Sequence, residues 1–454
     1  MAFFDAALAA AAHGPGAAYV LRGAGLPVAL VDGAAPDADR DGIARADVAV
    51  SAGRIAAIAP VGAIAADGRP VVDLDGGLVL PLCVDMHTHL DKGHIWPRRR
   101  NPDGRFMSAL EAVKADREAR WSAEDVRRRM DFALRSAYAH GTRAIRTHLD
   151  SIPPQHEISW PVFAETRAAW AGRIELQAVA LVGPDTMLDP GALEEVARVA
   201  GPLGGVVGGA IAAFPHARTA IANVVATAAR HGLDLDLHVD ETDDPDAQSL
   251  RILAETVLAT GYSGRVVAGH CCSLARQDAE TQDRTMDLVA RAGIAVVSLP
   301  MCNMYLQDRD AVTVPGGAGP RTPRWRGVTL VREMRARGIA VAISSDNTRD
   351  PFYAYGDLDG LEVLREGVRI LQLDQPVGDF VDVVSRRPAD ILGLADHGRL
   401  KVGNAADFLA VAARGYTELF ARPWADRAVV RDGVLVRAVL PDYRELDDLM
   451  EPSE

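Results

Sequence analysis

Apolar and polar positions follow one another along the chain in two different patterns. From Ala17 to Leu80, short β-like apolar runs are broken by Gly, Asp and Pro, which is typical of a small β domain. Runs of the same kind return at 406–413 and 427–440. We therefore expect one small β domain that is built from both ends of the chain, with a long insertion between its halves.

The insertion alternates strand-like with helix-like stretches. Eight apolar runs have the length of buried strands, and they lie at 78–89, 142–150, 173–181, 204–212, 233–241, 265–271, 294–300 and 339–347. Helical patterns intervene, for example at 122–141, 217–232 and 245–261. Eight β/α repeats predict a (β/α)8 barrel. A doubly wound open sheet is the alternative, but no GxGxxG motif follows an early strand.

The expected fold class is therefore α/β, a (β/α)8 TIM barrel with a small β-sandwich domain from both chain ends. We assign 79–396 to the barrel, and 17–78 together with 397–445 to the discontinuous β-sandwich. A length of 454 residues accommodates one large barrel and one smaller domain.

Composition narrows the class of protein. With 48% hydrophobic and 24% charged residues, the chain has the make-up of an ordinary globular protein. A net charge of −13 argues against a surface for nucleic acids or anionic membranes. No apolar run reaches the roughly 18 residues of a membrane span, and the N-terminal residues lack the basic start of a signal peptide. The four cysteines form no CxxC pair, so we expect a reducing, cytoplasmic location.

Side chains suited to metal binding and proton transfer recur where the predicted strands end. They are His87 and His89 on the first strand, His148 and Asp150 on the second, His238 and Glu241 on the fifth, His270 on the sixth and Asp346 on the eighth. All strands of a barrel end at the same mouth. We therefore expect these side chains to cluster there, although they are far apart in the sequence.

Their chemistry indicates a metal-dependent hydrolase. Three imidazoles and one carboxylate suit Zn²⁺ or Fe²⁺, with water completing the shell, and such a metal lowers the pKa of bound water toward about 7. Asp346 can ligate the metal and accept the proton of the water. Glu241 can carry that proton to a ring nitrogen or leaving group, and His270 can stabilise the developing negative charge.

The same stretches resemble a known family. The motifs are HTHLD, RTHLD, HVDETDD, GHCCSL, NMYLQDR and SSDNTRDPFYAYG, in this order, followed by ADILGLADHGRLKVGNAADFLAV at 389–411. Together they resemble the amidohydrolase superfamily, and within it the cytosine deaminase group, over about residues 18 to 440. The SSDNTRDPF stretch is also similar to N-isopropylammelide amidohydrolase.

This resemblance implies a set of site residues and an activity. The implied metal ligands are His87, His89, His238 and Asp346, with Glu241 as proton shuttle and His270 as an assisting residue. The fourth strand carries no lysine that could bridge two metals, so one divalent ion, Zn²⁺ or Fe²⁺, is expected. The implied reaction is hydrolytic deamination of an amino-substituted nitrogen heterocycle of pyrimidine, purine, pterin or triazine type, in which metal-bound hydroxide attacks and ammonia leaves.

Three further residues are expected to contact the substrate. Phe352 occupies an aromatic position of the family and can stack on a planar ring, and Lys92 can bind a carbonyl or anionic edge. A solvated loop cation is the alternative for Lys92. Asn347 is assigned to the same group. Gly183 stands where cytosine deaminases carry a glutamine that reads the pyrimidine edge, which argues against cytosine itself.

Two other functions stay open at this point. The same site could hydrolyse a cyclic amide or an N-alkylamine C–N bond, or the chain could be a scaffold without activity on the same fold. A scaffold is expected to lose metal ligands, and this chain keeps them. The expected partner is a small heterocyclic substrate, without nucleic acid or membrane, and a homo-oligomer is left open.

Overall fold

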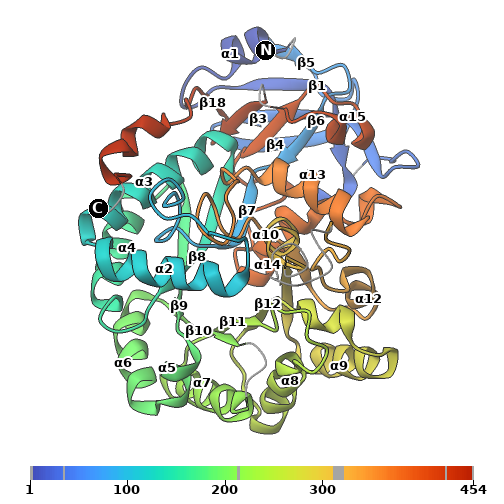
Figure 1. Cartoon of the computed structure of the whole chain (residues 1–454). Coiled ribbons are helices and arrows are strands. Elements are labelled where there is room, and N and C mark those ends of the chain that lie inside the picture. Colours follow the sequence, from blue (N-terminus) through green and yellow to red (C-terminus); the bar gives the residue numbers. More distant parts are fainter. Residues whose placement is uncertain (1–3, 34–35, 212–214, 310–321, 425–426, 452–454) are drawn as a thin grey trace. The chain divides into compact units, whose positions relative to one another are not determined.

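A computed structural model describes residues 4–33, 36–211, 215–309, 322–424 and 427–451 (Figure 1). Contacts divide the chain into two compact units. The first comprises Met1–Asp85, Ser136–Ala144 and Asp359–Leu440, and the second comprises Met86–Arg135, Ile145–Leu358 and Pro441–Glu454. The domain limits assigned from the sequence stay a prediction.

The first unit contains a mixed sheet that joins both ends of the chain. Its strands are β1 (Tyr19–Pro27), β3 (Ile43–Ser51), β4 (Arg54–Pro60), β5 (Val71–Asp73), β6 (Leu78–Pro81), β16 (Phe408–Val411), β17 (Ala428–Arg431) and β18 (Val434–Val436). The order is β18-β17-β16-β6-β1-β3-β4, and β5 pairs with β1. The antiparallel β6–β16 pair, in which Leu80 lies opposite Leu409, links the two chain ends. β2 (Val31–Asp32) and β15 (Leu400–Lys401) form a separate pair.

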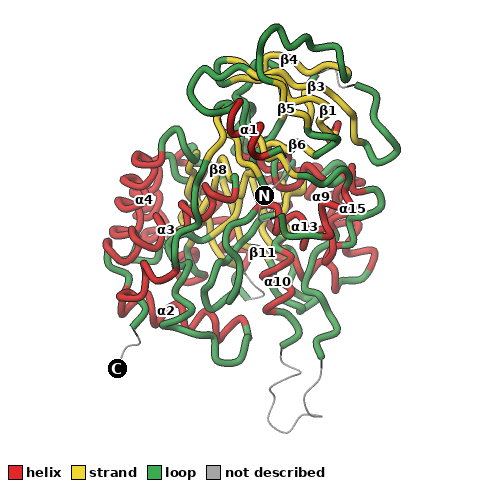
Figure 2. The backbone as a smooth tube through the Cα atoms, turned by 90° about the horizontal axis from the view of Figure 1, so that it is seen from above, coloured by secondary structure: helices red, strands yellow, loops and turns green. Residues whose placement is uncertain are grey.

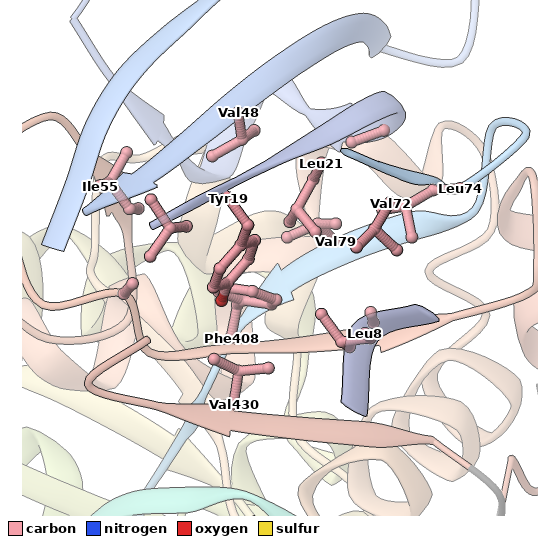
Figure 3. Packing of buried hydrophobic residues seen from close by; sticks show 14 of the residues in the cluster. Leu8, Tyr19, Leu21, Val48, Ile55, Val72, Leu74, Val79, Phe408 and Val430 are labelled. Carbon is pink, nitrogen blue, oxygen red and sulfur yellow. The ribbon is translucent and has the colours of Figure 1, made fainter. Parts of the chain in front are cut away.

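The core of this sheet is assembled from the same two ends (Figure 3). Tyr19 and Leu21 of β1, Phe408 of β16 and Val430 of β17 are all buried. The hydroxyl of Tyr19 donates a hydrogen bond to the carbonyl of Gly433 at 3.0 Å, so its polar end is satisfied inside the core. The apolar runs near the two ends of the chain therefore pack into one shared core.

The second unit is built around an eight-stranded parallel sheet. It begins with β7 (Cys83–Thr88) and continues with β8 (Thr142–Asp150), β9 (Glu175–Leu181), β10 (Val206–Ile211), β11 (Leu235–Val239), β12 (Val266–His270), β13 (Ala295–Ser298) and β14 (Val341–Ile343), each beside the next. A parallel bridge between Thr88 and Asp346 brings the two edges together, and the Asp346 N–H donates to the His87 carbonyl at 2.9 Å. The sheet is thus a nearly closed barrel.

Helices alternate with these strands and enclose them, as Figure 2 shows for β8 and β11. They are α2 (Phe106–Arg120), α3 (Ala123–His140), α4 (His156–Trp170), α5 (Pro184–Leu188), α6 (Pro190–Ala200), α7 (Ala217–His231), α8 (Ser249–Thr260), α9 (Ala279–Ala292), α10 (Pro300–Leu306) and α12 (Val331–Ala336). Gly232 and Gly261 end α7 and α8 in the left-handed conformation that glycine adopts without strain.

Four more helices lie outside this series. They are α1 (Asp5–Ala11), α13 (Gly360–Leu371), α14 (Arg386–Leu392) and α15 (Tyr416–Ala421), and all four belong to the first unit. In the part of the chain that the structure describes, no helix is both long and apolar enough to cross a membrane. The predicted fold class, an α/β barrel with a small β domain from both chain ends, is confirmed.

Candidate active site

Polar side chains from distant parts of the sequence meet at the ends of the barrel strands. His87 lies near the end of β7 and His89 directly follows it, while His238 lies in β11 and His270 ends β12. Asp346 follows β14 at the bridge that nearly closes the barrel. All five side chains are buried. The expected clustering of these residues is thus present in the structure.

Four of these side chains place a possible ligand atom within 3.6 Å of the ligand atom of a neighbour. His238 Nε2 lies 3.2 Å from His87 Nε2 and 3.3 Å from His89 Nε2. Asp346 Oδ1 lies 3.2 Å from His89 Nε2 and 3.6 Å from His87 Nε2. Ligands that surround one Zn²⁺-sized ion at about 2.0–2.1 Å stand roughly 3.3 Å apart in a tetrahedral arrangement. These spacings are compatible with a divalent metal ion. His87, His238, His270 and Asp346 also bring one possible ligand atom each within 4.8 Å of one another.

The protonation states favour the same interpretation. Burial is the largest cause that lowers the pKa values of His87, His89 and His238 well below the usual histidine range, and neighbouring imidazoles and the Lys92 ammonium act in the same direction. Neutral imidazole is the form that binds metals. A buried His/His/His/Asp cluster is thus consistent with a divalent metal site, and these ligand types suit both Zn²⁺ and Fe²⁺.

A second group of ligand types lies beside the first but is poorly suited to a cation. His148 of β8, Asp236 of β11 and His87 place possible ligand atoms within 4.8 Å of one another. However, Arg146 Nη1 lies 3.0 Å from Asp236 Oδ2. The guanidinium already neutralises this carboxylate and would repel a second cation. The His148 ring instead packs against His87, with ring centroids 4.0 Å apart.

Asn303 of α10 joins the two residues expected to act on protons. Its amide nitrogen Nδ2 lies 2.9 Å from Glu241 Oε1 and 2.9 Å from His270 Nδ1, and an amide NH₂ can donate to both acceptors. Donation to Nδ1 keeps the ring proton of His270 on Nε2. No sequence pattern considered above indicated a role for Asn303. Its position directly after the seventh strand, within the NMYLQDR motif, is the signal that could have identified it.

Glu241 and His270 differ in the direction of their pKa shifts. Burial, and after it the nearby Asp346 carboxylate, raises the pKa of Glu241 well above the usual carboxyl range. Burial lowers the pKa of His270 to about 3. Glu241 therefore keeps its proton to a higher pH than an ordinary carboxyl group, whereas His270 stays neutral and acts as a hydrogen-bond donor.

Lys92 lies in a buried ionic network next to Phe352. Its side chain is only 6% exposed, which excludes the alternative of a solvated loop cation. Lys92 Nζ lies 3.1 Å from Asp150 Oδ1 and 5.3 Å from the centroid of the Phe352 ring. Burial opposes the charge of Lys92, but the carboxylates, led by Asp150, raise its pKa overall. The ammonium therefore stays charged beside an aromatic face.

Asn347, the third expected substrate contact, is engaged within its own loop. Its Nδ2 donates to Asp350 Oδ2 at 2.7 Å, and Asp350 Oδ1 accepts from the Phe352 N–H at 2.8 Å. The structure thus brings Lys92 and Phe352 together, whereas the Asn347 amide orders the loop that presents Phe352. The sequence analysis did not identify Asp350.

Comparisons with known proteins agree with this geometry. A model of the amidohydrolase family matches residues 119–440. The chain is 52% identical to a pterin deaminase from Rhizobium rhizogenes over 434 residues, which cover 96% of this chain and 97% of the relative. It is 23% identical over 354 residues to the N-isopropylammelide isopropyl amidohydrolase of a Pseudomonas species, which covers 75% of this chain and 81% of the relative.

A solved structure shows the same fold. The 5-methylcytosine deaminase from Klebsiella pneumoniae superimposes with a TM-score of 0.76 at 24% identity, covering 93% of this chain and 98% of the other. The predicted superfamily and the predicted class of enzyme, a deaminase that hydrolyses non-peptide C–N bonds, are confirmed. The matched family model spans most of the chain, and the relative that is 52% identical spans nearly all of it. The chain therefore belongs to the amidohydrolase family.

Proposed function

We propose that this enzyme deaminates pterins, replacing the amino group on C2 of a 2-amino-4-oxopteridine with oxygen and releasing ammonia. The observation that carries the proposal is the 52% identity to a pterin deaminase over 96% of the chain. The family and the buried His/Asp cluster support deamination of an amino-substituted heterocycle in general. The choice of pterin among these heterocycles is the part that we propose.

The residue after β9 argues against cytosine as the substrate. Gly183 stands at the position where the resemblance places a pyrimidine-reading glutamine. Glycine offers no side-chain amide to hydrogen-bond the edge of a cytosine ring.

Four residues would hold the metal. His87, His89, His238 and Asp346 supply the converging Nε2 and Oδ1 atoms. A divalent ion bound there, for which we propose Zn²⁺ or Fe²⁺, supplies Lewis-acid activation of water at neutral pH.

The remaining steps are assigned to residues of the chain. Asp346 accepts a proton from the attacking water, and Glu241 delivers a proton to the ring nitrogen next to C2. His270, with its proton on Nε2, stabilises the negative charge that develops on the incoming oxygen. Asn303 holds Glu241 and His270 through contacts of 2.9 Å each. When the C2–N bond breaks, Asp346 passes its proton to the amino nitrogen, which leaves as ammonia, and Glu241 takes the proton of the C2 hydroxyl, so that the pteridine-2,4-dione remains.

Lys92 and Phe352 are proposed to bind the ring itself. The Phe352 ring offers a face for stacking on the flat pteridine, and the charged Lys92 lies 5.3 Å from its centroid. An ammonium at that place can donate to the 4-oxo group or an adjacent ring nitrogen, and a donor that is held in a buried site discriminates strongly against rings that lack the acceptor.

A panel of substrates tests this function. Ammonia release by the metal-loaded enzyme is measured with pterin, cytosine and an aminotriazine. We expect kcat/KM for pterin to exceed that for cytosine by about 100-fold or more, the discrimination that a matched buried hydrogen bond provides. Ammonia from cytosine or the triazine, without ammonia from pterin, would contradict the proposed substrate. Release of an alkylamine from an N-alkylated ring in place of ammonia would favour the alternative reaction, hydrolysis of an N-alkylamine C–N bond.

A further inference from the structure

The last described residues of the chain pack onto the barrel unit. They belong to the segment Pro441–Glu454 and contain the 3-10 helix η6 (Tyr443–Leu449). Arg135 Nη2 lies 2.7 Å from Glu445 Oε2, and Arg98 Nη1 donates to the Leu449 carbonyl at 3.0 Å. The segment is therefore anchored by side chains of α3 and of the loop after β7. The sequence analysis had placed its first part in the β domain.

The loop after β14 carries several residues of the site in an unfavourable backbone conformation. It runs from Asp346 to Leu358 and contains Phe352. The backbone φ values of Asp346, Arg349 and Leu358 are +64°, +49° and +57°. Residues other than glycine rarely adopt such positive φ values. Such conformations persist only where surrounding contacts enforce them. The loop therefore depends on contacts from outside.

The loop after β7 supplies part of this support. The Trp96 N–H donates to the Arg349 carbonyl at 2.8 Å, and the His94 N–H donates to the Thr348 carbonyl at 2.9 Å. Lys92 precedes these residues in the same loop. Two loops that carry proposed substrate contacts are thus joined by backbone hydrogen bonds next to Arg349.

Tyr443 of η6 contacts the β14 loop at two places. The guanidinium carbon of Arg349 lies 4.0 Å from the centroid of the Tyr443 ring, and the Tyr443 hydroxyl donates to Asp357 Oδ1 at 3.2 Å. Arg349 lies three residues before Phe352 and Asp357 lies five residues after it. One side chain from the end of the chain therefore connects both flanks of the segment that presents Phe352.

We propose that Tyr443 is a positioning residue of the active site, which holds the 346–358 loop in its substrate-binding conformation through Arg349 and Asp357. The cation–π contact and the hydrogen bond to a carboxylate both favour the observed loop over alternatives. Without the ring, the strained loop is expected to sample other conformations and to bind the substrate ring less tightly. The proposed metal ligands are not expected to move, because Asp346 at the start of the loop is held by its bridge to Thr88 and by the hydrogen bond from its N–H to the His87 carbonyl.

The test compares Tyr443→Ala with Tyr443→Phe, which keeps the ring and loses only the hydroxyl. The readouts are kcat and KM with pterin, metal content, and hydrogen exchange of residues 346–358. For Tyr443→Ala we expect KM to rise about two- to fivefold with kcat nearly unchanged, as for the loss of one exposed cation–π contact; Tyr443 is 43% exposed. Metal content should be unchanged and exchange in the loop faster. Tyr443→Phe should recover most of the wild-type KM.

Two controls keep the result interpretable. Val439→Ala changes a side chain that is 86% exposed just before the segment, and it should match wild type in every readout. Arg349→Met removes the same contact from the loop side, so it should reproduce the effect even if Tyr443→Ala does not fold.

The kinetic readout rests on the proposed pterin substrate, whereas hydrogen exchange does not. If pterin is not turned over by wild type, the proposed function fails and the exchange of 346–358 still decides the role of Tyr443. Unchanged exchange in both Tyr443→Ala and Arg349→Met would overturn the inference. An unchanged KM for both variants in an enzyme that is active on pterin would overturn it as well.

Discussion

Replacing Glu241 with Gln is expected to lower kcat for deamination by about 10²- to 10⁴-fold, the contribution of a positioned general acid or base. Glutamine keeps the size of the side chain and can still contact Asn303, which lies 2.9 Å from Glu241 Oε1. It cannot carry a proton from water to the ring. Because Glu241 is not among the four residues proposed to hold the metal, the variant should keep its metal, which is measured alongside kcat.

Glu195→Gln is the matched control. Glu195 also pairs with a histidine, His156, at 3.2 Å, but its side chain is 43% exposed and it lies in α6. This variant should have normal kcat. Normal turnover in Glu241→Gln would remove the role of Glu241 in proton transfer, and loss of metal from that variant would show that Glu241 acts on the metal site instead.

Replacing His238 with Ala should remove both the metal and the activity. His238 Nε2 lies 3.2 Å from His87 Nε2 and 3.3 Å from His89 Nε2, so its loss would take away one of the three proposed nitrogen ligands. We expect metal content well below one ion per chain and kcat/KM lower by about 10³-fold or more at stoichiometric metal. The melting temperature should also fall, because a bound metal stabilises the folded state.

His231→Gln is the control for this variant. His231 is the last residue of α7, and its Nε2 lies 2.6 Å from Glu194 Oε1, apart from the groups of possible metal ligands found among the described residues. This variant should keep both metal and turnover. A His238→Ala variant with full metal content would show that the converging atoms are not the ligand set.

The sequence predicted the parts of the site that depend on strand ends. His87, His89, His238, His270 and Asp346 could be placed together because parallel barrel strands end at one mouth. The spacing of apolar residues located the strands, and the resemblance to the family implied the role of each site residue. The close convergence of the Nε2 and Oδ1 atoms then appeared in the structure without a further assumption.

Contacts between side chains distant in sequence could not be predicted in this way. Asn303 lies 62 residues from Glu241, and no periodic pattern connects the two. Asp350 orders the Phe352 loop through hydrogen bonds that depend on the local turn. Tyr443 follows the last β-like run of the sequence, and only the folded chain shows that it contacts Arg349. The apolar pattern of a sequence predicts individual helices and strands. Which side chains of different helices, strands and loops contact one another is set by tertiary packing.

The central claim is that one metal ion in the His/Asp cluster supports the deamination of pterin. The most direct measurement is a titration of metal-free enzyme with Zn²⁺ or Fe²⁺, in which ammonia release from pterin is followed at each addition. We expect no turnover without metal and a linear rise in ammonia release that levels off at one equivalent of metal per chain. Full turnover by the metal-free enzyme, or a plateau reached only at two equivalents, would contradict it.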